Sequence, residues 1–184
     1  MARRPLIAVS GDGTAEPGSP HWVCAEGLGA ALVDAGHRVV TGGLGGVMEA
    51  VSRGARRSAA YRDGDTLALV PGHLASAANA YCDVVLPTGL DHARNVLVAH
   101  ADALVAIGGG AGTLSEIALA WVHRRLVIAF RLPGWSGRLA DAPVDQRRRF
   151  REIPDDRVFG VDTPTEAVEV LAARLHAYVA AAAE

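Results

Sequence analysis

Short apolar runs alternate along this chain with longer segments in which apolar residues recur every three or four positions. Such alternation is typical of βαβ units, in which parallel strands form a sheet that helices cover on both faces. The pattern therefore predicts an α/β domain of three layers, with a mostly parallel sheet of about six or seven strands. The expected strands are Leu6–Ser10, Arg38–Thr41, Thr66–Val70, Val84–Leu86, Ala103–Ile107, Leu126–Phe130 and, at an edge, Val158–Val161.

Residues with known capping preferences mark where helices begin and end. Ser19 followed by Pro20 predicts a helix that starts with Ser19 as N-cap and stops at Gly36. A capping box with proline at the first helical position, Thr163 to Glu166, predicts the last helix, which runs into the terminal alanines. Further helices are expected around Val47, Met48 and Val51, from Asp91 to His100, and from Thr113 to Val122.

Residues 133–156 are rich in Pro, Gly, Asp and Arg and show neither strand nor helix periodicity. We expect this segment to be an irregular surface excursion without a second core. A length of 184 residues suits one domain and is sufficient for a sizeable hydrophobic core. Residues 1–184 are therefore predicted to form a single domain.

The charge of the chain gives no sign of a polyanionic partner. The net charge is -2, so no overall positive field would attract nucleic acid or an anionic membrane surface. A local run of arginines, Arg147 to Arg149 with Arg151, lies beside Glu152, Asp155 and Asp156. This mixture predicts a solvated surface, and neither a nucleic acid nor a membrane is expected as a partner.

All 18 basic residues are arginines, because no lysine occurs in the sequence. This absence excludes a Schiff base to pyridoxal phosphate and the P-loop lysine that binds the terminal phosphates of a nucleotide. A pyridoxal-dependent lysine decarboxylase is thereby excluded.

The sequence shows no clear signal peptide, membrane span or metal-binding motif. The first apolar run breaks at Ser10 and Gly11, too early for a signal peptide, and no stretch approaches the roughly 18 apolar residues of a membrane span. We therefore expect a cytoplasmic protein. Neither the histidines nor Cys24 and Cys82 have the spacing of a metal site, so no metal and no cofactor are predicted.

Two glycine-rich turns connect an expected strand to an expected helix: TGGLGGVMEA from Thr41 and GGGAGTLSE from Gly108. In a parallel sheet both turns lie at the carboxyl ends of strands, where ligands of such folds bind. Glycine allows close backbone approach, and the exposed amides at a helix N-terminus attract phosphate, although glycine also serves tight turns. The dinucleotide pattern GxGxxG fails at Thr113, so a monophosphate held on one turn fits better than a dinucleotide.

Three charged residues near these turns have two interpretations each. Thr113 and Glu116 have capping-box spacing, with Thr113 as N-cap, but Thr113 is also placed to bind a phosphate and Glu116 to face a sugar. Arg94 is either solvated or, if its helix points to the same sheet edge, an anion ligand. Glu49 and Met48, just inside the other glycine turn, are open to the same two interpretations, since the helix dipole favours Glu49 there without any function.

These motifs together resemble the LONELY GUY family of nucleoside-monophosphate phosphoribohydrolases, often labelled lysine decarboxylases, over residues Ile7 to about Phe130. The family signature PGGxGTxxE appears here from Gly108 to Glu116, with Gly108 in place of proline. The segments GGLGGVMEAVSRGA, LDHARN and GGGAGTLSEIALAW are similar to a bacterial branch that includes molybdenum cofactor carrier-like proteins. The resemblance implies a Rossmann-like nucleotide-binding fold and a homodimer or homotetramer.

The resemblance leaves two functions open. In the phosphoribohydrolases the arginine of a His-x-Arg-Lys segment and the glutamate of the signature support cleavage of the N-glycosidic bond of a nucleoside 5′-monophosphate. Arg94 and Glu116 match them as catalytic residues and His92 matches as well, whereas Asn95 replaces the lysine. The alternative is a non-catalytic carrier or sensor of a nucleotide or a molybdopterin-type cofactor. The expected ligand-binding residues are Gly11, Gly42, Gly43, Gly45, Gly46, Met48, Glu49, Asn95, Gly109, Gly110, Gly112 and Thr113.

Overall fold

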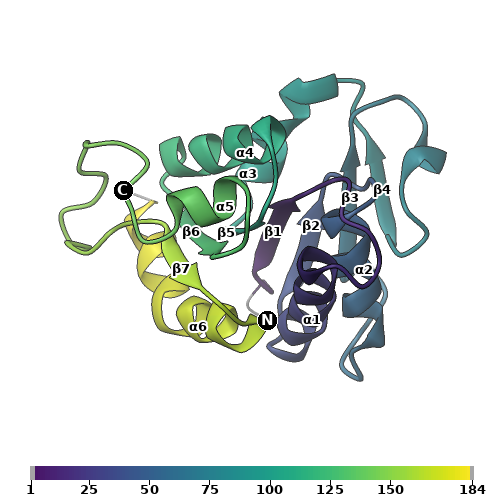
Figure 1. The fold of residues 1–184 in the computed structure, drawn as a ribbon, viewed down its shortest axis with the longest axis horizontal. Coiled ribbons are helices and arrows are strands. Elements are labelled where there is room, and N and C mark those ends of the chain that lie inside the picture. The colour runs from purple at the N-terminus through teal and green to yellow at the C-terminus, as the bar shows by residue number, and fades with distance from the viewer. Residues whose placement is uncertain (1–2, 183–184) are drawn as a thin grey trace.

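The computed structural model describes residues 3–182, here called the described chain. Within it, seven strands alternate with six α-helices (Figure 1). The strands are β1 (Leu6–Gly11), β2 (Arg38–Thr41), β3 (Thr66–Val70), β4 (Val84–Pro87), β5 (Ala103–Ile107), β6 (Leu126–Phe130) and β7 (Phe159–Val161). The helices are α1 (Pro20–Asp34), α2 (Val47–Arg57), α3 (Asn95–Ala99), α4 (Ala111–Val122), α5 (Trp135–Leu139) and α6 (Pro164–Ala181), with two short 3₁₀ helices, η1 (Ala75–Ala77) and η2 (Asp91–Arg94).

The strands of the described chain form one parallel sheet in the order β4-β3-β2-β1-β5-β6-β7, which confirms the predicted sheet. The chain starts at β1 in the middle, builds outward to β4, and then returns to place β5 on the other side of β1. The direction of growth thus reverses between β1 and β5, which pair from Ile7 with Ala103 to Gly11 with Ile107. Open α/β sheets bind ligands at this kind of switch point.

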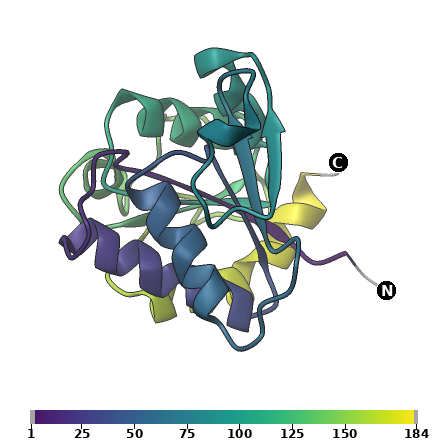
Figure 2. The ribbon, with the colours of Figure 1, turned by 90° about the vertical axis from the view of Figure 1, so that its right-hand side faces the viewer.

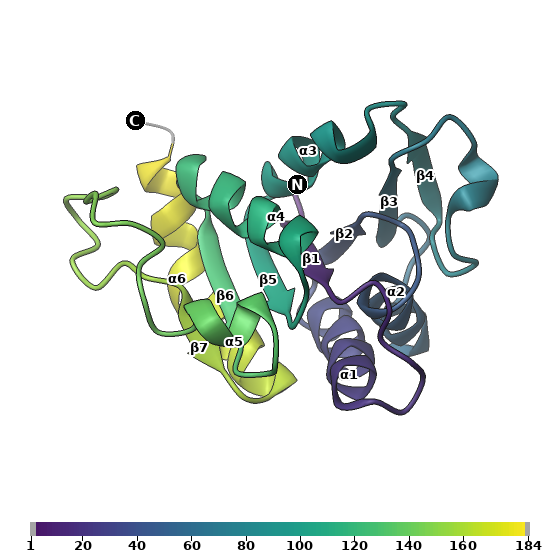
Figure 3. The same cartoon turned by 45° about the horizontal axis from the view of Figure 1, so that its top comes forward.

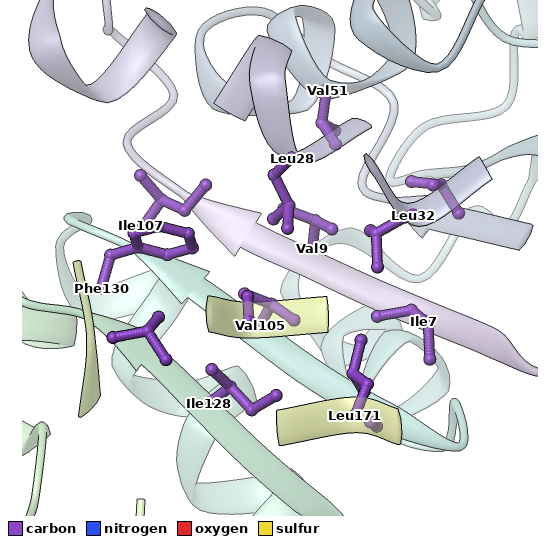
Figure 4. Packing of buried hydrophobic residues seen from close by; sticks show 14 of the residues in the cluster. Ile7, Val9, Leu28, Leu32, Val51, Val105, Ile107, Ile128, Phe130 and Leu171 are labelled. Atoms are coloured by element: carbon purple, nitrogen blue, oxygen red, sulfur yellow. The ribbon is translucent and has the colours of Figure 1, made fainter. Parts of the chain in front are cut away.

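Helices cover both faces of the sheet and complete the three layers. α1, α2 and α6 lie on one side, with α1 and α2 next to each other, and α3 and α4 lie on the other side (Figures 2 and 3). Alternate residues of each central strand supply the two cores. Ile7, Val9 and Val105 face α1 and α6 (Figure 4), whereas Ala8 and Leu104 face α3 and α4.

Burial on both faces explains the continuous apolar runs of the central strands. Every residue of β5 and of β6 is buried, as is usual for a parallel strand that helices cover on both sides. The edge strands β4 and β7 are shorter, and β4 exposes alternate residues. The strand pattern therefore follows directly from how deeply each strand lies in the sheet.

Two expected elements differ in the structure. The helix expected from Asp91 to His100 is split into η2 and α3, and its first residue, Asp91, has a positive φ of 49°, outside regular helix geometry. Segment 133–156 is not wholly an irregular surface excursion, since it contains α5 and the buried side chain of Phe150. Phe150 packs edge-on against Tyr178 of α6, with ring centroids 5.0 Å apart, so part of the segment belongs to the main core.

The single-domain prediction for residues 1–184 includes residues 1–2 and 183–184, which lie outside the described chain. Across residues 3–182 we find no helix with both the length and the apolar character needed to cross a membrane.

Candidate functional site

The ends of β1 and β2, residues 92–95 and the first turns of α2 and α4 surround a small pocket beside the switch point. Its volume is about 120 Å³. Residues from four separate parts of the chain meet there, as the convergence of strand ends in a parallel sheet requires. The lining residues are Val9, Ser10, Gly11, Gly42, Met48, His92, Arg94, Asn95, Gly112, Thr113 and Glu116.

Gly42, at the end of β2, makes room for Arg94. A Cβ atom at Gly42 would lie 2.3 Å from Nη1 and 2.4 Å from Nη2 of Arg94, closer than any real contact. The guanidinium therefore lies against the bare backbone of the β2 turn. In the structure Arg94 is only 9% exposed, so the expectation that it is solvated is wrong and it points into the sheet edge instead.

Arg94 and Glu116 form a buried ion pair in this pocket. Nη1 of Arg94 donates to Oε1 of Glu116 over 3.3 Å, and the hydroxyl of Ser10 donates to Oε2. Burial raises the pKa of Glu116, against the opposing effects of Ser10 and Arg94, and burial lowers the pKa of Arg94. The buried Nε of Arg94 has no hydrogen-bond partner among residues 3–182. A buried donor left without an acceptor is costly.

The N-terminus of α4 opens into the same pocket. Gly110 is the N-cap and no side chain caps the helix. The first α-helical hydrogen bond runs from Leu114 to Gly110, so the helix gives no acceptor to the preceding amides. Gly110, Ala111 and Gly112 are exposed. These amides and the positive end of the helix dipole favour an anion at this position.

The capping box expected at Thr113 and Glu116 is wrong. The helix begins two residues before Thr113, because Gly110 occupies the N-cap position. The hydroxyl of Thr113 instead donates to the carbonyl oxygen of Gly11 over 3.2 Å and ties α4 to the end of β1. Glu116 bonds Ser10 and Arg94, so both side chains connect strand ends around the pocket.

Hydrogen bonds from the segment that starts α5 fix the second glycine turn in place. Gly108 donates its N–H to Oγ of Ser136 over 2.7 Å, and Ser136 in turn donates to the carbonyl oxygen of Phe130. The backbone amides of Trp135 and Ser136 donate to the carbonyl oxygens of Gly109 and Gly108 over 3.0 Å. Part of segment 133–156 therefore fixes the shape of the candidate site.

Not every glycine expected in the site lines the pocket. Gly43 and Gly46 have φ values of 77° and 63° and pack against Ala68 and Asp12. Gly109, with φ of 85°, gives space to the side chain of Thr113. Gly45, Glu49, Gly109 and Gly110 are likewise absent from the lining of this pocket. Turn geometry and close packing explain most of these glycines.

A wider groove of about 650 Å³ adjoins the small pocket and lies between α3 and α4. His92, Asn95 and Gly112 line both spaces, so the two are continuous at these residues. The groove is mainly apolar, since its other lining residues are Ala93, Val96, Ala111, Ser115 and Leu119. Together the two spaces match the size and character of a small-molecule site, which is largely apolar with a few polar groups.

The model of the SLOG cluster4 family matches residues 4–168, nine tenths of the sequence. The chain belongs to the SLOG cluster4 family. This membership confirms the expected relationship to the LONELY GUY-like proteins and their Rossmann-like fold.

Solved structures similar to this SLOG chain include named cofactor proteins. A structural-genomics target called TM1055 has a TM-score of 0.77 and 30% identity, covering 92% of this chain and 99% of that chain. The molybdenum cofactor binding protein of the phototrophic bacterium Rippkaea orientalis has a TM-score of 0.76 and 29% identity, covering 94% and 98%. The molybdenum cofactor carrier protein of Chlamydomonas reinhardtii has a TM-score of 0.74 and 26% identity, covering 95% and 99%.

Sequence reasoning on this SLOG chain missed two polar residues around the site. Ser10 bonds Glu116, and Ser115 lines the groove. His92, which the resemblance had matched, lies on the rim of both spaces. Ser10 was detectable, because it ends the first strand at the same sheet edge as the two glycine turns. The position of Ser115 depends on which side of α4 faces the groove, and that follows only from the packed fold.

The arginine run outside the site also differs from expectation. Arg149 is not solvated: its side chain is 6% exposed, pairs with Asp156 over 2.6 Å and stacks 3.5 Å above the ring of Trp121. It acts as a packing residue between α4 and the core. In the part of the chain that the structure describes, no cluster of three metal-ligating side chains is present.

Proposed function

We propose that this protein binds a phosphorylated small molecule, with the phosphate in the small pocket and the remainder in the adjoining groove, and carries it without chemical change. The observation that carries the proposal is the convergence of Arg94 and the uncapped N-terminus of α4 on one pocket of about 120 Å³. Both supply donors, and the fold gives no acceptor to the exposed amides at the start of α4.

A phosphate group suits these donors better than a neutral group does. Charge-assisted hydrogen bonds to a buried arginine contribute about 1.5–3 kcal/mol each, and a helix N-terminus adds to the attraction. The lining includes one carboxylate, Glu116, whose charge is already opposed by Arg94.

The groove and the relatives support a flat, ring-containing ligand. The apolar surface between α3 and α4 fits one face of a heterocycle, while the phosphate stays at the end of the sheet. Two similar proteins are named as a molybdenum cofactor binding protein and a molybdenum cofactor carrier protein. We therefore favour a phosphorylated pterin of the molybdopterin type, with a purine nucleoside monophosphate as the closest chemical substitute.

The environment of Glu116 favours carriage over catalysis. Each carboxylate oxygen is engaged inside the protein, one with Ser10 and one with Arg94, and the residue is 7% exposed. A group that stabilises positive charge on a sugar carbon needs an oxygen directed at that carbon. Here the carboxylate serves to orient Arg94.

Native mass spectrometry of freshly purified protein tests the proposal. We expect a retained phosphorus-containing molecule, and we expect Arg94→Gln to lose it. Arg131→Gln is the matched control, because Arg131 is an exposed arginine that pairs with Asp141 away from the pocket. If the protein retains no small molecule and binds neither inorganic phosphate nor GMP, the proposal is wrong.

A phosphoribohydrolase is the second candidate, and the buried Arg94–Glu116 pair favours it. In this alternative Glu116 would stabilise the charge that develops at the anomeric carbon of a nucleoside 5′-monophosphate, and Arg94 would hold the substrate. Incubation with AMP, GMP and IMP should then release free base, and Glu116→Gln should abolish the release. No release from wild-type protein would exclude the hydrolase among these substrates.

A further inference from the structure

Asn95 lies where the small pocket opens into the wider groove. It is the first residue of α3, it is 6% exposed, and it lines both spaces. A ligand whose phosphate reaches Arg94 and whose ring occupies the groove has to pass this side chain. Asn95 is therefore placed to contact the part of the ligand next to the phosphate.

The hydrogen bonds of Ser115 fix which way the amide of Asn95 points. The hydroxyl of Ser115 lies 2.7 Å from the carbonyl oxygen of Gly112, and a carbonyl only accepts, so Ser115 must donate its proton there. Ser115 then has only lone pairs for Asn95, which lies 2.7 Å away, and the contacting atom must be Nδ2. The orientation of this amide thus follows from its partners, which is the condition for assigning it.

This orientation leaves the Oδ1 atom of Asn95 as a free acceptor. Within the described chain Oδ1 receives no hydrogen bond, and it is not among the buried polar atoms that are cut off from solvent. The relay from Gly112 through Ser115 therefore holds a carbonyl oxygen in place at the junction of the two spaces. Arg94 and the amides of α4 supply donors, so Oδ1 adds the opposite polarity to the site.

We infer that Asn95 determines specificity by accepting a hydrogen bond from an O–H or N–H group of the ligand, next to its phosphate. The inference rests on the proposed function, because it requires the phosphate to lie beside Arg94. A sugar hydroxyl and a ring N–H are the two sources of such a donor. A ligand that lacks a donor there would leave Oδ1 without a partner, and this discriminates more strongly than a missing apolar contact does.

Ser115 acts in this scheme as a positioning residue. It lines the groove, and its hydroxyl decides whether the acceptor or the donor end of Asn95 faces the ligand. Removing the hydroxyl should let the amide rotate without removing it. Threonine keeps a hydroxyl and should preserve the relay.

Isothermal titration of wild type, Asn95→Leu, Ser115→Ala and Ser115→Thr with inorganic phosphate, ribose 5-phosphate and GMP tests the inference. We expect Asn95→Leu to lower the affinity for GMP about tenfold, the loss of one buried hydrogen bond, while the affinity for inorganic phosphate changes less than twofold. Ser115→Ala should give a smaller loss of affinity for GMP, again with little change for inorganic phosphate, and Ser115→Thr should behave as wild type.

The ribose 5-phosphate titration identifies the source of the donor. A tenfold loss with both ribose 5-phosphate and GMP places the donor on the sugar, and a loss with GMP alone places it on the ring. Equal changes for all three compounds, or unchanged selectivity with only a lower unfolding temperature, would overturn the role of Asn95. Should Asn95→Leu fail to fold, Ser115→Ala decides by the same criterion.

The two proposals fail in different ways. If wild-type protein binds none of the three compounds, the proposed function is wrong and the role of Asn95 falls with it. If wild type binds inorganic phosphate and GMP but selectivity survives in both Asn95→Leu and Ser115→Ala, only the role of Asn95 is wrong.

Discussion

Replacing Gly112 by alanine should make the protein more stable and a weaker binder. Gly112 lies in the first turn of α4 and lines both the small pocket and the groove. A Cβ atom added there would meet no atom within 4 Å beyond its chain neighbours and the nearby backbone of its own helix, and the backbone has no positive φ that would strain alanine. The methyl group would therefore stand in the open space that we assign to the ligand.

The substitution should raise the stability of the fold and lower the affinity for the ligand, and the size of each effect can be worked out separately. Alanine is better than glycine in a helix by up to about 1 kcal/mol, which in a chain of this length corresponds to a rise in melting temperature of about 2–4 °C. A methyl group is close to a water molecule in size, so it would take up a substantial part of a pocket of only about 120 Å³. Overpacking of this kind costs about 1–3 kcal/mol, equivalent to a 5- to 150-fold loss of affinity.

Thermal unfolding followed by circular dichroism measures the first effect, and titration with GMP and inorganic phosphate measures the second. Gly72→Ala is the control, because Gly72 also has open space around it but lies in an exposed loop after β3, outside both lining sets. An unchanged affinity in a stable Gly112→Ala protein would refute the placement of the ligand at the start of α4.

Three further predictions concern residues that shape the site or the fold. Gly42→Ala should displace Arg94 and reduce phosphate binding about tenfold or more, the loss of one charge-assisted hydrogen bond; binding equal to wild type would show that Arg94 is not a ligand. Ser136→Ala should lower the free energy of unfolding by about 1–3 kcal/mol, measured by urea denaturation, because the N–H of Gly108 loses its buried acceptor. Burial lowers the pKa of His37, so the unfolded chain takes up a proton first and stability should fall as the pH drops below about 6.5. His37→Phe should lose less stability than wild type between pH 7.5 and pH 5, and an equal loss would contradict this assignment.

The strands were predictable because burial on both faces leaves a strong signal. The runs at β1, β5 and β6 are continuous and apolar, and they are too short to be buried helices. The caps of α1 and α6 were equally clear, since Ser19 accepts from Trp22 and Thr163 accepts from Glu166 as their spacing implies. Local chemistry fixes these features, so a single sequence suffices to find them.

The candidate site was predictable in position but not in detail. Parallel strands bring Gly42, Arg94 and Glu116 to one edge, and the two glycine turns pointed to that edge. The sequence pattern placed Thr113 at a helix cap, because threonine three residues before glutamate has the same spacing inside a helix as at its start. Only the fold shows that Gly110 is the N-cap of α4. Only the packing against Ala68 shows that Gly43 has a structural role. The homodimer or homotetramer that the resemblance implies stays a prediction.

A crystal structure of the protein grown with inorganic phosphate would show whether an anion binds between Arg94 and α4. We expect one phosphate in the small pocket, with its oxygen atoms within hydrogen-bond distance of the guanidinium of Arg94 and of the backbone amides of Gly112 and Thr113. A phosphate bound only beside the arginines near Trp121, or crystals that show no phosphate between Arg94 and α4 at saturating concentration, would contradict it.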